Sequence, residues 1–408
     1  MQQAVLVTGL GVLTPIGNTL DEFWENSLKN LVGYDIHDDA NIQYHEKRIY
    51  GKVSSFEYLG RSMQDENSSE MGRPTLLALN AAIRAMQDSK INLNDIDKSR
   101  ACIIIGNAIS DTPYCERAYL NQLNVDENRY KKGMFTCIAS ELALEFDFQG
   151  EVGVISTGCT AGIDAIGHAY ELIRMGEADV VICGGAEAPI ANITFSSFEA
   201  IGALAKGFEM TPKEASRPFD KKRNGFVLSE GAGVIILESS EHAKKRNAKV
   251  YGEILAYASA NNASHMTDLK ENDALAKTIK NVLADAGLKP QDISYINAHG
   301  SSTQQNDSYE TSTFKKVFGE CIYNIPISST KSLIGHPLGA ASAIEIAHTL
   351  LAINHSIVPP TGNYEVPDSS CDLQYNKNPI QHEIKYAIKT ANGFSGIHST
   401  LLIGKYFG

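Results

Sequence analysis

The chain has 408 residues, of which 43% are apolar and 21% are charged, and its 36 Lys and Arg against 48 Asp and Glu give a net charge of −12. The length fits two domains or one large fused unit, and the apolar fraction excludes a mainly disordered chain. We expect no nucleic-acid partner, because binding to phosphates requires a positively charged surface.

The N-terminal segment runs from Met1 directly into an apolar run without a basic flank, so we expect no signal peptide. No stretch of the sequence approaches the ~20 consecutive apolar residues that a membrane-spanning helix needs. We therefore expect a cytoplasmic protein without membrane association, in which thiols stay reduced.

Short apolar runs that end in glycine or polar residues predict ten strands, at residues 5–9, 101–106, 153–157, 179–183, 233–237, 251–256, 293–298, 325–329, 386–390 and 399–403. Apolar residues at three- and four-residue spacing predict helices at residues 20–29, 74–88, 161–175, 274–287, 307–318 and 340–351. Thr19 is the expected N-cap of the first helix. This alternation predicts α/β layers with mainly parallel sheets.

The polar and basic stretch 243–249 is a candidate border between two α/β halves, residues 1–250 and residues 251–408. The alternative is that this stretch is only the solvated end of a helix. No short-period repeat or low-complexity linker interrupts the sequence, so we expect the halves to pack tightly against each other.

The glycine and cysteine patterns of the sequence do not support a cofactor or metal site. Gly9 and Gly11 follow the first predicted strand, but Thr14 occupies the position of the third glycine in a dinucleotide-binding fingerprint, so a Rossmann site is disfavoured. The seven cysteines are too sparse for a disulfide framework and form no C-x-x-C pair, so we predict no metal site. They are either buried apolar residues or include one that carries chemistry.

Cys159 is the cysteine with a distinctive context. The segment GVISTGCTAG (residues 153–162) passes from a predicted strand through small residues into a predicted helix, as in a nucleophile elbow. The helix N-terminus would favour a thiolate, and the Cys159 N–H could face a developing oxyanion. The alternative is a buried structural cysteine at a tight turn.

Two histidines follow predicted strands in loops rich in glycine and small hydroxyl residues. His299 lies in NAHGSST (residues 297–303), and His336 lies in STKSLIGHPLGAA (residues 329–341). α/β proteins place ligand-contacting groups at the C-terminal ends of their strands. A lone histidine is more often a surface or core residue, but two such loops together with Cys159 favour one shared site.

These segments resemble the signatures of the β-ketoacyl-acyl carrier protein synthases, which are condensing enzymes of the thiolase superfamily. The Cys159 elbow, the His299 segment, and Lys331 with His336 occur in the family's order, followed by GFSG at residues 393–396. The resemblance also covers residues 215–220 and 225–231 and spans nearly the whole chain. It implies a thiolase fold, in which two similar α/β halves form a five-layer αβαβα sandwich.

Within this family, the run STGCTAG, the segment after His299 and residues 358–365 most resemble the ketosynthase (alpha) subunits of type II polyketide synthases. Those subunits pair with a homologous chain-length factor that lacks the cysteine, so the resemblance implies a heterodimer. The alternative is a homodimeric synthase of fatty-acid elongation. A thiolase is disfavoured because no second cysteine follows Cys371. A non-catalytic subunit is disfavoured because Cys159 and both histidines are present, and a Cys-His hydrolase is a further alternative.

The resemblance implies a decarboxylative Claisen condensation in ping-pong order. Cys159 accepts an acyl chain from the phosphopantetheine arm of an acyl carrier protein, so no separate cofactor is expected. The backbone N–H groups of Cys159 and Phe394 form the oxyanion hole. His299 and His336 hold the malonyl thioester carbonyl and stabilise the enolate that CO₂ loss leaves.

The resemblance also implies supporting residues. Lys331 is expected to pair with Glu310, although such a buried pair can be purely structural. Ser301 and Thr303 are expected to bind the phosphopantetheine arm, with loop capping as the alternative. Phe394 is the expected gate of the acyl pocket, or else a core aromatic. Since Ser395 replaces a glycine of the family's loop, we expect reduced flexibility there.

The acyl carrier protein is acidic in related systems, so its docking requires a local basic patch on this acidic chain. The candidate patch consists of Arg217, Lys221, Lys222 and Arg223. The alternative is that this charge run is only a solvated face.

Overall fold

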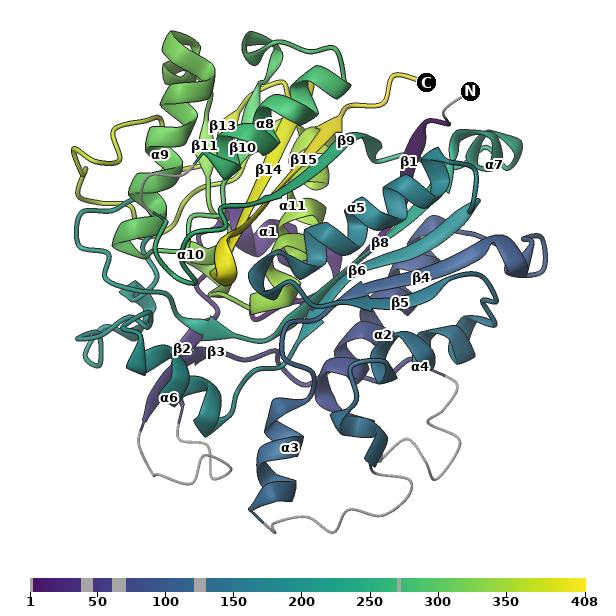
Figure 1. Cartoon of the computed structure of the whole chain (residues 1–408), viewed down its shortest axis with the longest axis horizontal. Helices are drawn as coiled ribbons and strands as arrows, with labels where there is room; N and C mark the ends of the chain where they lie inside the picture. The colour runs from purple at the N-terminus through teal and green to yellow at the C-terminus, as the bar shows by residue number, and fades with distance from the viewer. Residues whose placement is uncertain (1–2, 38–46, 61–70, 121–129, 270–272) are drawn as a thin grey trace.

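The computed structural model describes residues 3–37, 47–60, 71–120, 130–269 and 273–408. Within these residues ten strands form one continuous sheet (Figure 1). In their order across the sheet they are β11 (Ile327–Ser328), β10 (Tyr295–Asn297), β14 (Tyr386–Gly393), β15 (Ile397–Gly404), β9 (Gly252–Asn261), β1 (Val5–Leu13), β8 (Gly231–Ser239), β6 (Val180–Glu187), β4 (Ala101–Gly106) and β5 (Val152–Ile155). Only residues 5–7 of β1 and 252–254 of β9 join the two halves of this sheet.

Helices form three layers around the two halves of the sheet. The central layer consists of α5 (Ala161–Arg174), which packs on β4, β6 and β15, and α11 (Ala341–His355), which packs on β8 and β14. The outer layers are α2 (Arg73–Ser89) with α4 (Cys137–Phe146) on the first half, and α8 (Ala274–Asp285) with α9 (Gln304–Phe318) on the second. The five-layer αβαβα arrangement predicted from the sequence is therefore present.

The prediction of mainly parallel sheets is wrong. Within the ten-stranded sheet, parallel pairing is confined to β6–β4–β5 in the first half and β14–β10–β11 in the second. The strands between them, β8, β1, β9 and β15, pair antiparallel with their neighbours. One cause is local, because β14 returns into β15 through the short turn at residues 394–396, and a hairpin pairs antiparallel.

All six predicted helices are present, with changed ends. Thr19 accepts a hydrogen bond from the Glu22 N–H and so caps α1 (Leu20–Leu28) as predicted. α9 begins before the predicted residue 307, because the Thr303 side chain accepts from the Asn306 N–H as its N-cap. Residues 240–245 form α7, and residues 246–251 connect it to β9. No helix within the described ranges is long and apolar enough to cross a membrane.

Several short strands and helices were not predicted from the sequence. A three-stranded sheet consists of β2 (Tyr34–His37), β3 (Arg48–Gly51) and β7 (Leu228–Ser229). The other missed elements are α3 (Thr112–Tyr119), α4, α6 (Asn192–Ala200), α7, α10 (Lys331–Ile334), β12 (Ile357–Val358) and β13 (Ile380–Gln381). Most of these span fewer than three helical turns or only a few strand residues, which is too short for hydrophobic periodicity to register.

His348 ties α11 to α1 inside the core. Its ring is fully buried, with the Phe23 ring centroid 4.9 Å away. Its Nδ1 lies 3.0 Å from Thr330 Oγ1, and its Nε2 lies 3.0 Å from Ser27 Oγ. Burial lowers the pKa of His348 from 6.5 to about 3.

We expect the free energy of unfolding to fall as the pH drops from 6.5 towards about 3, because the unfolded chain then binds a proton at His348 that the folded chain excludes. Each pH unit in this window costs about 1.4 kcal/mol for one such group. Urea unfolding at a series of pH values measures the effect. His348→Gln should flatten the dependence by about one proton, and an unchanged dependence would contradict the assignment.

Candidate active site

A cavity of about 370 Å³ brings together residues from both halves of the chain. Its lining includes six residues predicted from the sequence: Cys159, His299, His336, Ser301, Thr303 and Phe394. The predicted supporting residues Lys331 and Glu310 are buried next to the His299 loop. The structure therefore places all the predicted site residues in one region.

Cys159 lies at the turn between β5 and α5, as the elbow motif predicted. Gly158 adopts a φ of 66°, a left-handed conformation that glycine accepts at little cost. Asp164, one turn into α5, accepts hydrogen bonds from the hydroxyls of Thr157 and Thr160. Its other oxygen accepts from Tyr257 at 2.8 Å and from Ser399. The Asp164 carboxylate therefore holds the elbow in place. This role was not predicted from the sequence.

Cys159 is 6% exposed, and burial raises the pKa of its thiol to about 11. The nearby Lys331 charge lowers that pKa, the buried Glu187 carboxyl raises it, and backbone N–H groups of Phe394 and Cys159 lower it. The predicted thiolate is therefore wrong for this closed site, because desolvation outweighs the groups that stabilise the anion. Attack by Cys159 requires that its proton leave as the substrate arrives.

Phe394 begins the turn between β14 and β15, directly beside the elbow. Its backbone N–H lies close enough to the Cys159 sulfur to lower the pKa of the thiol, so it can serve an oxyanion that forms on a carbonyl beside that sulfur. Its half-buried ring stacks on Phe198, with the ring centroids 6.0 Å apart. A side chain at Gly393 would lie 3.3 Å from the Thr157 carbonyl oxygen, so the turn passes close over the elbow.

His299 and His336 lie edge to face, with their ring centroids 5.3 Å apart. Burial and the charge of Lys331 hold the pKa of both imidazoles well below the usual range, so both rings are neutral. A neutral imidazole offers one N–H donor and one acceptor nitrogen. His336 Nδ1 is buried and has no hydrogen-bond partner among the described residues, so an oxygen or N–H group of a ligand would satisfy it.

The predicted pair of Lys331 with Glu310 is wrong. Lys331 Nζ donates to Glu345 Oε1 at 2.5 Å and to the His299 carbonyl at 2.8 Å. Glu310 instead accepts from the backbone N–H groups of His299 and Gly300, both at 2.8 Å. The reason is local, because the loop after β10 leaves these amides without strand partners, and the Glu310 carboxylate on α9 faces them. Both charged residues still hold the His299 loop.

A second buried lysine near the site, Lys389 on β14, was not predicted from the sequence. It is fully buried, and its Nζ lies 2.7 Å from Glu345 Oε2. The available signal was a single charge inside an apolar segment, in YAIKTANG for Lys389 and in ASAIEIAHTLLAINH for Glu345. Charged residues are rarely buried unless they are paired, so each lone charge indicated a partner elsewhere in the chain.

Ser301 and Thr303 line the cavity and also stabilise their own loop. The Ser301 Oγ lies 2.9 Å from Thr303 Oγ1. Thr303 Oγ1 accepts from the Asn306 N–H at 3.3 Å, which is the capping role considered as the alternative. Capping and contact with a ligand are compatible, because a hydroxyl can donate to a ligand while it accepts from the backbone.

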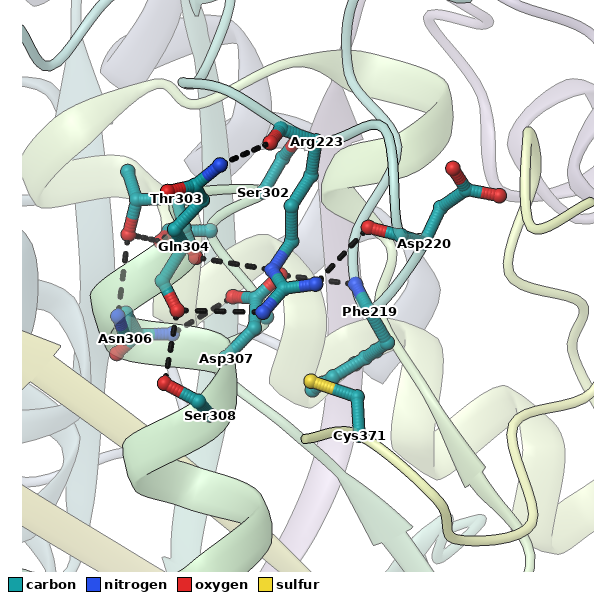
Figure 2. Close-up of polar contacts among 12 residues, drawn as sticks. Phe219, Asp220, Arg223, Ser302, Thr303, Gln304, Asn306, Asp307, Ser308 and Cys371 are labelled. Atoms are coloured by element: carbon teal, nitrogen blue, oxygen red, sulfur yellow. Dashed lines mark hydrogen bonds and ion pairs between the residues drawn. The ribbon is translucent and has the colours of Figure 1, made fainter. Parts of the chain in front are cut away.

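The predicted basic patch is wrong for its two arginines, which are buried in ion pairs. Arg217 Nε donates to Asp220 Oδ1 at 3.0 Å. Arg223 donates to the Gln304 carbonyl at 3.2 Å, and its Nε lies 3.6 Å from Asp307 Oδ2 (Figure 2). Arg223 therefore holds the segment that leads from Ser301 into α9. The exposed cations of the run are Lys221 and Lys222.

A cysteine on a strand-to-helix elbow, two neutral histidines and backbone N–H donors at the sulfur together define a condensing acyltransferase of the thiolase fold. The chain belongs to the β-ketoacyl synthase family. The family model "Beta-ketoacyl synthase, N-terminal domain" matches residues 2–243, and "Beta-ketoacyl synthase, C-terminal domain" matches residues 251–365.

Two similar relatives cover nearly the full length. The tetracenomycin polyketide synthase ketoacyl synthase alpha subunit of Streptomyces glaucescens is 37% identical over 417 residues, which covers 99% of this chain and 97% of that protein. The 3-oxoacyl-[acyl-carrier-protein] synthase 2 of Synechocystis sp. is 37% identical over 414 residues, which covers 99% of both. The family thus includes relatives with polyketide and with 3-oxoacyl synthase names.

Two solved structures match over 100% of both chains. One, a type II polyketide synthase acyl-carrier protein in complex with its ketosynthase bound to the hexaketide, gives a TM-score of 0.91 and 39% identity. The other, the ishigamide ketosynthase/chain length factor, gives a TM-score of 0.89 and 28% identity. These matches confirm the thiolase-type ketosynthase fold and the resemblance to ketosynthase alpha subunits.

Proposed function

We propose that this chain is the catalytic ketosynthase (alpha) subunit of a type II polyketide synthase, and that it extends a Cys159-bound chain with malonyl units carried on an acyl carrier protein. The observation that carries this proposal is the convergence of Cys159, His299 and His336 on one cavity. The similarity to the tetracenomycin alpha subunit over nearly the full length supports the polyketide class.

In the first half-reaction the Cys159 sulfur attacks the thioester carbonyl of the incoming acyl chain. The backbone N–H groups of Cys159 and Phe394 stabilise the oxyanion that forms, because they lie beside the sulfur and can reach the oxygen of the carbonyl that it attacks. The intermediate then collapses, the carbon–sulfur bond to the phosphopantetheine arm breaks, and the thiol of that arm leaves with the proton that Cys159 gave up. The acyl chain is now bound to Cys159.

In the second half-reaction malonyl-carrier protein enters the same cavity. N–H groups of His299 and His336 hold its thioester oxygen, and loss of CO₂ leaves an enolate on that oxygen. Two neutral imidazoles suit this step, since donors stabilise charge that develops only in the transition state. The enolate carbon attacks the acyl-Cys159 carbonyl, a carbon–carbon bond forms, the carbon–sulfur bond to Cys159 breaks, and the sulfur takes a proton from solvent to restore the resting thiol. Ser301 and Thr303 bind the phosphopantetheine arm, without any separate cofactor.

The partner proposed here is a homologous chain-length factor that lacks the cysteine. β5 lies at one edge of the ten-stranded sheet, and Val152 on this strand and Leu144 on α4 are exposed apolar residues close to that edge. An open strand edge beside apolar surface favours association with another chain. The same edge would serve a homodimer, which is the arrangement of the fatty-acid alternative.

Co-expression with a homologue that lacks the cysteine tests this proposal. We expect a stable heterodimer that converts malonyl-carrier protein into a polyketide, identified by its mass. A homodimer that elongates fatty acyl chains without the homologue would instead establish the fatty-acid alternative.

Ser395 follows the proposed gate Phe394 and adopts a φ of 69°, a left-handed conformation that costs a non-glycine residue about 1 kcal/mol or more. The serine therefore destabilises the closed turn rather than stiffening it. We expect Ser395→Gly to stabilise the closed gate and to slow acyl loading of Cys159 by up to roughly fivefold, which corresponds to about 1 kcal/mol.

Rapid-quench mass measurement gives the rate. Ser395→Ala keeps the strain and should load like wild type, and faster loading in Ser395→Gly would contradict this.

A further inference from the structure

Lys389 is a fully buried cation that the reaction above does not use. Its backbone belongs to β14, which leads into the turn beside Cys159 that begins at Phe394. Its Nζ donates to the carbonyl oxygens of Thr390 at 2.7 Å, Ala298 at 3.1 Å and Asn297 at 3.4 Å. The fourth neighbour is Glu345 Oε2 at 2.7 Å, an ion pair without hydrogen-bond geometry.

These four neighbours are all oxygen atoms, and three of them are backbone carbonyls. A cage of carbonyl oxygens around one positive charge is the environment in which proteins bind a desolvated monovalent cation. Burial lowers the pKa of Lys389 to about 8, while the charges of Glu345 and Glu310 oppose that shift. The ammonium therefore remains mainly charged at neutral pH, and it fills a place that a free cation would otherwise occupy.

Two of the four oxygens belong to the segment that leads into His299. Lys389 binds the carbonyls of the two residues before His299, and Lys331 binds the carbonyl of His299 itself at 2.8 Å. Glu310 accepts from the His299 N–H on the opposite side. Three charged side chains thus bind four backbone groups of this segment, and removal of Lys389 takes away the charged donor of two of its carbonyls and lets the segment shift.

We propose that Lys389 is a positioning residue for His299, and that its ammonium acts as a built-in monovalent cation whose removal opens a site for K⁺ or NH₄⁺. The kinetic part of this inference rests on the proposed condensing function, whereas the cation site does not. The three carbonyls match the three N–H donors of the ammonium, and Glu345 Oε2 adds a fourth oxygen, so a small cation placed at Nζ would have four oxygen neighbours.

The first test uses thermal unfolding, which is independent of activity. Lys389→Ala should show a higher Tm in KCl or NH₄Cl than in choline chloride at equal ionic strength, and the wild type should show no such difference. Lys385→Ala, a change at an exposed lysine close in sequence, is the matched control and should behave as wild type. A Tm of Lys389→Ala that is the same in all three salts would overturn the proposed cation site.

The second test measures the rate of condensation and the rate of Cys159 loading separately. In choline chloride we expect Lys389→Ala to lose about 10²-fold in condensation, as for a small misplacement of a catalytic group, with loading much less affected. NH₄Cl or KCl should restore part of the rate with saturation. Lys389→Met fills the same space without charge and should lose condensation without rescue. Wild-type condensation by Lys389→Met would overturn the proposal, whereas absence of condensation in the wild type would refute the proposed function instead.

Discussion

Cys159→Ala is expected to abolish both the acyl adduct and the condensation product, a loss of at least about 10³-fold in rate. The reason is that removal of a nucleophile leaves only binding and the oxyanion hole. Intact-protein mass spectrometry after incubation with acyl-carrier protein gives the first readout, and product formation from malonyl-carrier protein gives the second. An unaltered load in Cys159→Ala would refute Cys159 as the nucleophile.

Cys183 provides the matched control for this experiment. Its thiol is also buried, and burial raises its pKa well above the usual range, but it lies inside β6. Cys183→Ala should therefore load normally. The rate of alkylation by iodoacetamide reports the protonation state of the thiol. Modification of Cys159 should become faster with rising pH up to about 11, the pKa that burial sets for this thiol. A plateau near neutral pH would contradict the protonated resting state.

The features of the site that could be predicted are those encoded in contiguous segments. The elbow at Cys159 is a strand end, a glycine and a helix start in ten residues, and the two histidine loops are equally local. The structure brings these segments together because each follows a strand of the sheet and each faces the same cavity. The turn at Phe394 was predicted only from the resemblance to the synthase family.

The features that could not be predicted depend on which distant residues meet. Lys331 finds Glu345, 14 positions away on α11, rather than Glu310, because sequence spacing does not say which carboxylate faces which amide. The prediction of a thiolate at Cys159 was wrong for a related reason. The helix N-terminus is visible in the sequence, but the desolvation that raises the pKa depends on the packing of the whole cavity.

Glu345→Ala is expected to destabilise the protein by about 3–5 kcal/mol, the cost of breaking a buried ion pair by removing one partner. Glu345 is 0% exposed and contacts two lysines, with Oε1 at Lys331 Nζ and Oε2 at Lys389 Nζ. Without the carboxylate, two buried ammonium groups have lost their shared counter-charge, and each repels the other in a medium of low dielectric constant. Urea unfolding of wild type and variant gives the difference.

The pH dependence of this loss distinguishes a charge effect from a packing effect. Loss of Glu345 should lower the pKa of Lys389 below its present value of about 8, whereas the unfolded chain titrates near 10.5. As the pH rises towards about 8, the folded variant has already lost the proton that the folded wild type still holds on Lys389, so in this range the variant gains stability relative to wild type. Glu345→Gln, which keeps the volume of the side chain, should show the same recovery with a smaller deficit at neutral pH. A deficit that is constant across this range would mean that lost packing, and not the unpaired lysine charges, destabilises the variants.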